Sequence, residues 1–181
     1  MKLASAVYRL KSESAFEVLA RARELEAQGR TVVHMQIGEP DFDTPAHIVD
    51  AAIDALQRGE THYTPAAGIL PLREAIAAYV ERTRGCLVSP DQVVVTPGAK
   101  PIMFFTMLAL LEPGDECVYP DPGFPIYESM IRYIGAKPVP APLRMENHFR
   151  FDADELSDLV NDRTKLLILN SPQNPTGGVL L

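Results

Sequence analysis

The sequence contains no tryptophan and only two cysteines among its 181 residues. Cys86 and Cys117 lie far apart, unlike the close spacing of a redox pair or a zinc site, so we interpret both as reduced thiols. Reduced thiols suit the cytoplasm, which is the location we expect. Positive charge is also scarce, since the net charge is −7. This acidity argues against a general affinity for nucleic acid or for anionic membranes.

Long apolar runs are missing as well. The longest, residues 102–111, has about half the length needed to cross a bilayer, and we interpret it as a buried helix. The beginning, Met1–Leu10, lacks the features of a secretory signal. A metal site is not expected, because the four histidines are scattered. Glu39, Asp41 and Asp43 are interpreted as solvated carboxylates beside a proline turn.

Proline is the residue that the sequence has in excess, with 16 copies. This is about 9% of the chain, against a usual level of about 5%. Most of these prolines fall in predicted loops or in the first turns of predicted helices. There a fixed φ angle removes no hydrogen bond that the structure needs. The excess therefore indicates stiff loops rather than a low-complexity tract.

Helical and strand patterns alternate along the second half of the chain. Alternation of this kind predicts a mostly parallel sheet, and we expect an α/β fold of three layers, α/β/α, preceded by a helical arm. Helices are predicted between Ser12 or Ser14 and Gly29, Pro45 and Gly59, Pro71 and Gly85, Pro101 and Leu111, Pro125 and Gly135, and after the capping residue Asp152. Strands are predicted near residues 93–95, 116–119, 137–139 and 166–169.

Three predicted loops follow strands: residues 96–100, 120–124 and 170–178. Ligands of open parallel sheets bind beyond the carboxyl ends of the strands, so these loops are the candidate binding site. In the first loop, Gly98–Lys100 precedes a helix and offers backbone N–H groups and a lysine. That combination favours an anion, most naturally a phosphate. A helix start without a ligand would show the same pattern.

The other two loops add an aromatic ring and an amide. Phe124 could stack on a planar heterocycle, although a core phenylalanine would look identical. Asn170 and Asn174 lie on a frame stiffened by prolines, where an amide could donate a hydrogen bond to a phenolate-type oxygen. Asparagine is also a common turn residue for reasons of its own backbone. Together, a phosphate site, a ring and an oxygen partner describe a pocket for pyridoxal phosphate.

Four motifs occur in the order and spacing of a known family. They are Ile37–Pro45 (IGEPDFDTP), Tyr63–Gly68 (YTPAAG) with Leu72–Ile76, Thr96–Lys100 (TPGAK) and Asn170–Gly177 (NSPQNPTG). The sequence resembles the class I/II aminotransferases, which are pyridoxal-phosphate enzymes of fold type I. It is most similar to their bacterial aspartate aminotransferase branch. The resemblance covers essentially the whole chain, and the joint occurrence of four motifs is very specific.

The resemblance implies pyridoxal 5′-phosphate as the cofactor and assigns residues to it. Gly98, Ala99 and Lys100 would hold the phosphate, Phe124 would stack on the pyridine ring, and Asn174 would hydrogen-bond to the 3′-oxygen. The family exchanges an amino group between an amino acid and a 2-oxo acid, so these are the partners that the resemblance implies.

Further implications concern the rest of the chain. Gly38 resembles the residue whose backbone meets the substrate α-carboxylate. Tyr63 matches a tyrosine that reaches the cofactor phosphate of the neighbouring subunit, which implies a homodimer. Residues 1–45 would form the N-terminal arm and part of the small domain, and residues 46–181 a partial large domain that binds the cofactor.

The lysine that joins the cofactor covalently in this family has no counterpart here. None of the five lysines, which are Lys2, Lys11, Lys100, Lys137 and Lys165, stands in its motif, which follows the Asn170–Gly177 loop in the family. We therefore expect the chain to be the amino-terminal part of such an enzyme, without a catalytic residue and inactive alone. Two alternatives stay open: a non-catalytic binding or scaffold module on this fold, and a pyridoxal-phosphate-dependent carbon–sulfur lyase.

Overall fold

The computed structural model describes residues 2–10 and 14–180. The chain divides into two compact units. The first combines Met1–Val33 with Ala99–Leu181, and the second is His34–Gly98. The first unit carries the sheet, so the expected α/β class can be examined there.

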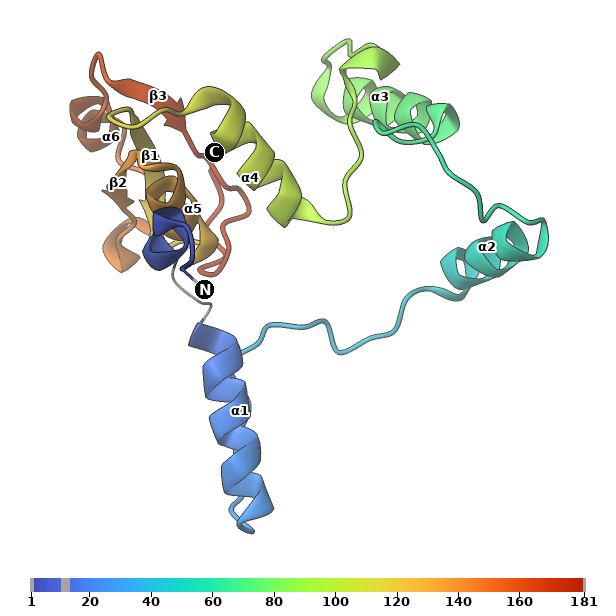
Figure 1. Ribbon diagram of the computed structural model, residues 1–181, viewed down its shortest axis with the longest axis horizontal. Coiled ribbons are helices and arrows are strands. Elements are labelled where there is room, and N and C mark those ends of the chain that lie inside the picture. The colour runs from blue at the N-terminus through green and yellow to red at the C-terminus, as the bar shows by residue number, and fades with distance from the viewer. Residues whose placement is uncertain (1, 11–13, 181) are drawn as a thin grey trace. The chain divides into compact units, whose positions relative to one another are not determined.

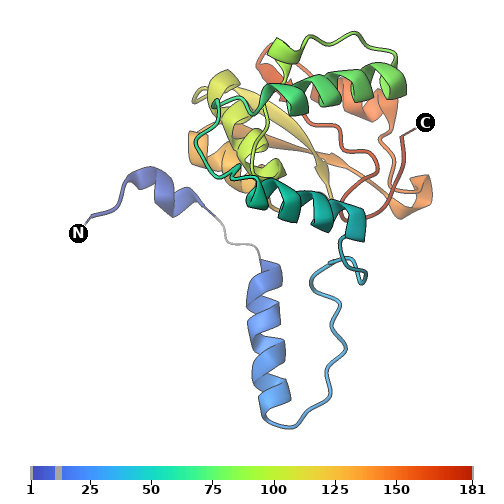
Figure 2. The ribbon, with the colours of Figure 1, turned by 90° about the vertical axis from the view of Figure 1, so that its right-hand side faces the viewer.

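The sheet has three parallel strands in the order β2-β1-β3 (Figure 1). They are β1 (Glu116–Asp121), β2 (Lys137–Pro142) and β3 (Thr164–Leu167), and Figure 2 shows them from a direction 90° away. β2 contains Pro138, Pro140 and Pro142, which an edge strand accepts because the missing N–H groups can face away from β1. The predicted strands at 116–119 and 137–139 and the parallel arrangement are confirmed, and the strand predicted at 166–169 is present but runs from Thr164 to Leu167.

Three helices cover this sheet: α4 (Ala99–Leu110), α5 (Ile126–Ile134) and α6 (Ala153–Leu159). α5 contacts β1 and β2, α6 contacts β2, and α4 contacts β3 and α5. The crossover through α5 runs from β1 to one edge, and the crossover through α6 runs back to the other. Because parallel crossovers are right-handed, opposite directions place α5 and α6 on opposite faces. The three-layer α/β/α arrangement is therefore present.

The main hydrophobic core lies between α4, α5 and the sheet. Met107, Cys117 and Ile131 are at its centre, each at most 1% exposed, and Tyr127 and Leu111 enclose it. Burial of each large apolar side chain contributes about 1.5–3 kcal/mol relative to its exposure. α4 leads into β1 through a short turn and thus runs antiparallel to it, so the N-terminus of α4 lies at the carboxyl end of the sheet. The core therefore holds both helix N-termini at that edge.

Two helices begin or end at residues that the sequence predicts. Gly135 follows α5 with a φ of 97°, and Asp152 caps α6 by accepting hydrogen bonds from the N–H groups of Asp154 and Glu155. The N-terminal region contains a short 3-10 helix, η1 (Ser5–Arg9), and α1 (Ser14–Ala27). Arg9 donates hydrogen bonds to the carbonyls of Arg132 and Tyr133, which attach η1 to the last turn of α5.

The second unit contains α2 (Ala46–Gln57), α3 (Leu70–Arg84) and the 3-10 turn η2 (Pro90–Gln92). The strand predicted at residues 93–95 is wrong. The segment is extended, and the N–H of Val95 donates to the carbonyl of Ala67 at 3.0 Å, but no strand forms within His34–Gly98. β-Branched residues favour the extended backbone, yet a strand needs a partner strand, which the pattern alone does not supply.

None of the helices within residues 2–10 and 14–180 is long and apolar enough to span a membrane.

Candidate functional site

The first candidate segment is the turn that leads into α4. Gly98 has a φ of 92°, a conformation that side chains with a Cβ rarely adopt. Its N–H donates to the carbonyl of Thr96 at 2.8 Å, and the Thr96 hydroxyl donates to the Gly98 carbonyl at 2.7 Å. The helix begins at Ala99, two residues earlier than predicted, so Ala99 and Lys100 lie in its first turn. First-turn N–H groups lack helical partners and carry partial positive charge, which suits an anion.

Lys100 and Phe124 lie together although they belong to different segments. The Lys100 Nζ atom is 5.6 Å from the centre of the Phe124 ring. Phe124 is partly buried and packs edge-to-face on Tyr127, with the ring centres 6.0 Å apart. Cation–π contacts at exposed positions contribute about 0.5–1 kcal/mol. The structure thus brings the predicted phosphate and ring residues to one place.

The tight turn after β1 fixes the position of Phe124. A Cβ atom on Gly123 would lie 2.1 Å from the carbonyl oxygen of Pro120, so a side chain there would force the backbone apart. Glycine is therefore required for this close approach. The N–H of Tyr127 then donates to the Phe124 carbonyl at 3.0 Å and starts α5.

The third candidate segment is the loop after β3. The backbone N–H of Asn174 donates to the Asn170 side-chain oxygen at 2.8 Å, and the Asn170 amide donates to the Pro172 carbonyl at 3.2 Å. The Asn174 side chain is exposed. Within residues 2–10, 14–33 and 99–180, no group hydrogen-bonds to its amide. Asn170 is therefore a structural residue of this loop, whereas the amide of Asn174 can donate to a ligand.

Gln173 joins this loop to the turn that carries Phe124. Its side-chain amide donates to the carbonyl of Pro122 at 2.8 Å. Its side-chain oxygen accepts from the backbone N–H and from the hydroxyl of Thr176, at 2.8 and 2.6 Å. Sequence reasoning missed Gln173. One signal could have indicated it: glutamine has no turn preference of its own, so its presence among the turn residues of this loop suggests another role.

The remaining predicted site residues lie in the unit His34–Gly98. Gly38 belongs to the exposed loop before α2, and no atom lies within 4 Å of the place where a Cβ would stand. Tyr63 lies between α2 and α3, and its side chain is fully exposed in this chain. Both residues can therefore be reached by a ligand or by another chain.

Two further groups with shifted pKa values, Cys117 and Tyr119, lie on β1 and are buried or partly buried. Burial raises the pKa of the Cys117 thiol to about 12 and contributes most to raising that of the Tyr119 phenol to about 12. Both groups therefore stay protonated, and Cys117 is unsuited to nucleophilic catalysis. Among residues 2–10 and 14–180, no group of three or more His, Cys, Asp or Glu side chains is placed to hold a metal ion.

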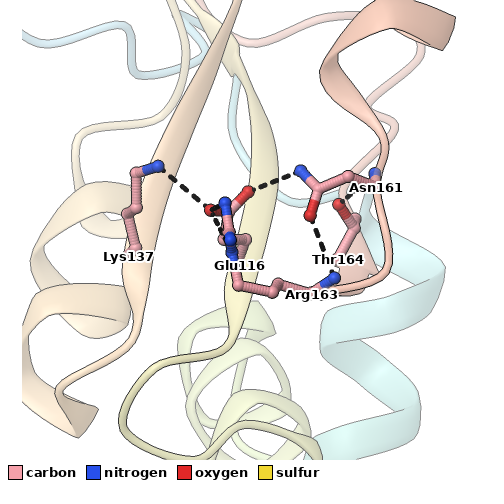
Figure 3. Close-up of polar contacts among 5 residues, drawn as sticks. All are labelled: Glu116, Lys137, Asn161, Arg163 and Thr164. Carbon is pink, nitrogen blue, oxygen red and sulfur yellow. Dashed lines mark hydrogen bonds and ion pairs between the residues drawn. The ribbon is translucent and has the colours of Figure 1, made fainter.

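A buried carboxylate lies at the opposite, amino-terminal end of β1. Glu116 is 2% exposed and accepts hydrogen bonds from Asn161 at 2.8 Å, Lys137 at 3.0 Å and Arg163 at 3.0 Å (Figure 3). The bond from Asn161, followed by those from Lys137 and Arg163, lowers its pKa from 4.5 to about 2. The donors come from β2 and from the turn before β3, so Glu116 joins the three strands and belongs to the scaffold.

Comparison with known proteins decides the family. The family model "Aminotransferase class I and II" matches residues 30–180. The chain belongs to the class I and II aminotransferases. Enzymes of this family depend on pyridoxal phosphate, so the cofactor implied by the four motifs is the family's cofactor. The three-stranded sheet with its helices is part of the α/β fold of these transferases, as expected.

The similarity to individual relatives covers nearly all of this chain. A probable aspartate/prephenate aminotransferase of Aquifex aeolicus is 42% identical over 98% of the chain and 45% of its own length. An arginine–pyruvate transaminase of Pseudomonas aeruginosa is 42% identical over 92% of the chain and 42% of its own length. The structure of the Thermus thermophilus aspartate aminotransferase with maleate has a TM-score of 0.93 at 40% identity, covering 99% of this chain and 47% of that one. The chain thus spans somewhat less than half the length of these relatives.

The residues at the carboxyl edge of the sheet fit the family's cofactor. A helix N-terminus with a nearby lysine suits a phosphate, an aromatic ring suits a pyridine, and an exposed amide suits a phenolate oxygen. Ala99, Lys100, Phe124 and Asn174 all lie in the first compact unit, and Gly98 directly precedes it. The residues whose chemistry suits the cofactor therefore belong to, or directly precede, the unit that carries the sheet.

Proposed function

We propose that this chain is the cofactor-binding portion of a pyridoxal-phosphate-dependent aminotransferase that exchanges an amino group between an amino acid and a 2-oxo acid. The observation that supports this most strongly is the contact between Lys100 and Phe124, together with the link from Gln173 to the Phe124 turn. These contacts assemble three separate segments at the sheet edge where a ligand is expected. Membership of the aminotransferase family supplies the chemistry.

Each residue has a distinct task in this proposal. Gly98, Ala99 and Lys100 bind the phosphate through backbone N–H groups and the ammonium group. Phe124 stacks on the pyridine ring and excludes water from one of its faces. Asn174 donates a hydrogen bond to the 3′-oxygen and so favours its ionised form. When bound, pyridoxal phosphate supplies an electron sink that stabilises negative charge at the substrate α-carbon.

The second unit contributes to substrate binding and assembly. Gly38 offers its backbone to the substrate α-carboxylate, and its lack of a side chain leaves the approach open. Tyr63, which is fully exposed, reaches the cofactor phosphate of a second subunit, so we propose a homodimer with shared sites. Residues 1–45 are then the arm and part of the small domain, and residues 46–181 are the partial large domain. A cytoplasmic location accords with Cys86 and Cys117, which form no disulfide.

Catalysis requires a lysine that this chain does not carry in the required context. Lys100 is assigned to the phosphate, and Lys137 is paired with Glu116. We therefore propose that the 181-residue chain binds the cofactor but does not transaminate alone. The names of the relatives give different substrates, aspartate or prephenate for one and arginine with pyruvate for the other, so the proposal extends to the substrate class only.

Calorimetric titration of the chain with pyridoxal phosphate tests this function. We expect saturable binding that inorganic phosphate weakens by competition. Borohydride treatment of the complex followed by peptide mapping tests the role of Lys100, which should be modified no more than the exposed Lys165. Absence of binding would refute the proposal. Preferential modification of Lys100 would refute its assignment to the phosphate.

A further inference from the structure

We infer that Gln173 is the positioning residue that sets the distance between the ring-stacking and oxygen-binding parts of the cofactor site. This inference rests on the proposed function, because it concerns the same cofactor. It assigns no direct contact with the cofactor to Gln173. The residue acts through Phe124 on one side and through Asn174 on the other.

Gln173 is 4% exposed, and all four of its polar groups are bonded. Its backbone N–H donates to the carbonyl of Gly178 at 2.8 Å, and its own carbonyl accepts from the N–H of Gly177 at 2.7 Å. The side chain donates to Pro122 and accepts twice from Thr176. A buried polar group in a fully satisfied network has one favoured geometry, because any displacement leaves a buried donor or acceptor without a partner.

This geometry connects two parts of the proposed site. Pro122 precedes the constrained Gly123, which leads directly to Phe124, so the bond to the Pro122 carbonyl fixes the start of the ring-bearing turn. On the other side, Asn174 follows Gln173 in the chain, and its backbone N–H is itself held by Asn170. The amide of Gln173 is therefore the hydrogen-bonded link between the Phe124 turn and the Asn174 loop.

The far side of the loop leaves little room for an adjustment. A Cβ atom on Gly178 would lie 2.6 Å from the carbonyl oxygen of Phe149, so the loop approaches that segment closely. Bonded to Pro122 on one side and closely packed on the other, the loop has a fixed position. The loop therefore has little freedom to compensate for a substitution at Gln173, and we expect loss of the bond to Pro122 to change the position of Asn174 relative to Phe124.

The side chain of Gln173 is needed both as a hydrogen-bond donor and as a hydrogen-bond acceptor. Gln173→Met keeps the approximate shape but removes both the donor and the acceptor, and it leaves the Pro122 carbonyl without its partner. Gln173→Glu keeps an acceptor for Thr176 but removes the donor to Pro122. Gln28→Met is the matched control, since Gln28 lies at an exposed position after α1. Thermal unfolding of each variant establishes that the fold is retained.

Calorimetry on the 181-residue chain should separate the ring site from the phosphate site. We expect Gln173→Met to weaken binding of pyridoxal phosphate by about tenfold, because the Pro122 carbonyl and Thr176 both lose their hydrogen-bond partner. Binding of inorganic phosphate should stay within about twofold, since Gln173 bonds to Pro122, Thr176, Gly177 and Gly178, which lie outside α4. Gln173→Glu should resemble Gln173→Met, and Gln28→Met should bind like the unmodified chain.

A spectroscopic pH titration separates a positioning role from a merely structural one. The absorbance of bound pyridoxal phosphate reports the ionisation of its 3′-oxygen, which Asn174 favours. We expect both Gln173→Met and Asn174→Ala to raise the apparent pKa of that oxygen. The double variant should raise it no further than Asn174→Ala alone, because Gln173 acts through Asn174.

The results distinguish this inference from the proposed function. If the unmodified chain does not bind pyridoxal phosphate, the proposed function fails and the inference fails with it. If the chain binds but folded Gln173→Met and Gln173→Glu show an unchanged affinity and an unchanged pH profile, only the inference is overturned. Equal losses for phosphate and pyridoxal phosphate would also overturn it, because they would indicate a general disturbance of the unit.

Discussion

The ammonium nitrogen of Lys100 lies 5.6 Å from the centre of the Phe124 ring. One residue belongs to the first turn of α4 and the other to the turn between β1 and α5. The hydrophobic core that joins α4, α5 and β1 holds both turns at the carboxyl edge of the sheet. The cation that we assign to the cofactor phosphate and the aromatic ring that we assign to the pyridine thus lie together.

Removing the Lys100 ammonium group should weaken cofactor binding through the phosphate. We expect Lys100→Ala to weaken binding of both pyridoxal phosphate and inorganic phosphate by about tenfold, since charge-assisted hydrogen bonds contribute about 1.5–3 kcal/mol and exposure reduces that value. Calorimetric titration measures both affinities. Lys165→Ala, which removes the same charge from an exposed position of β3, is the control and should change neither. Equal losses of affinity in the two variants would contradict a specific role of Lys100, because they would show that only the net charge of the chain affects phosphate binding.

Substitution of Phe124 should weaken binding of the pyridine ring of the cofactor and leave binding of the phosphate unchanged. Phe124→Leu keeps an apolar side chain but removes the aromatic face, which is worth about 0.5–1.5 kcal/mol beyond burial. We expect pyridoxal phosphate to bind about fivefold more weakly, with the affinity for inorganic phosphate unchanged. The control is Phe105→Leu, on an exposed side of α4. A parallel loss for inorganic phosphate would contradict the stacking role.

Glu116 makes the fold sensitive to acid. Its pKa is lowered from 4.5 to about 2, so its bonds stabilise the folded state above about pH 4.5. This contribution is lost as the pH falls from 4.5 toward 2, because the unfolded chain then binds a proton that the folded chain resists. Glu116→Gln should lower the free energy of unfolding at pH 7 and should flatten its decline between pH 5 and 2.

Urea unfolding at several pH values measures this effect. Glu146→Gln, at an exposed position, removes the same charge and should leave the curve close to that of the unmodified chain. An identical pH dependence in the chain and in Glu116→Gln would show that the bonds from Asn161, Lys137 and Arg163 do not stabilise the fold.

Replacing glycine by alanine should destabilise the chain at Gly123 but not at Gly38. Gly123→Ala places a Cβ atom 2.1 Å from the Pro120 carbonyl oxygen and should destabilise the chain by about 1–3 kcal/mol. Gly38→Ala meets no atom within 4 Å and should leave the thermal midpoint unchanged. Thermal unfolding followed by circular dichroism compares them. A stable Gly123→Ala variant would contradict the described turn.

Local signals in the sequence predicted most of the first unit. The stop at Gly135, the cap at Asp152 and the alternation of strands with helices each depend on a few neighbouring residues. The strand at 93–95 failed because strand formation depends on a partner elsewhere in the chain. Residues Gly98–Lys100 and Asn174 were predicted from motifs that occur in the order of a known family, and Phe124 was predicted from a loop that follows a strand.

Long-range polar contacts escaped prediction for a physical reason. Glu116 finds Asn161 and Arg163, and Gln173 finds Pro122, only after the sheet brings distant segments together. Nothing in the local pattern distinguishes a buried, bonded carboxylate or amide from an exposed one. Such residues are found from the fold, and in this chain they hold the scaffold and the proposed site in place.

The central claim is that one edge of the sheet binds pyridoxal phosphate through named groups, and amide NMR during a titration of the 15N-labelled chain tests it most directly. We predict saturable shifts that are largest for the backbone N–H groups of Ala99 and Lys100 and for the side-chain amide of Asn174. Inorganic phosphate should shift the first two alone. Saturation with the largest shifts elsewhere, or no saturable shift at any of the three, would contradict the account.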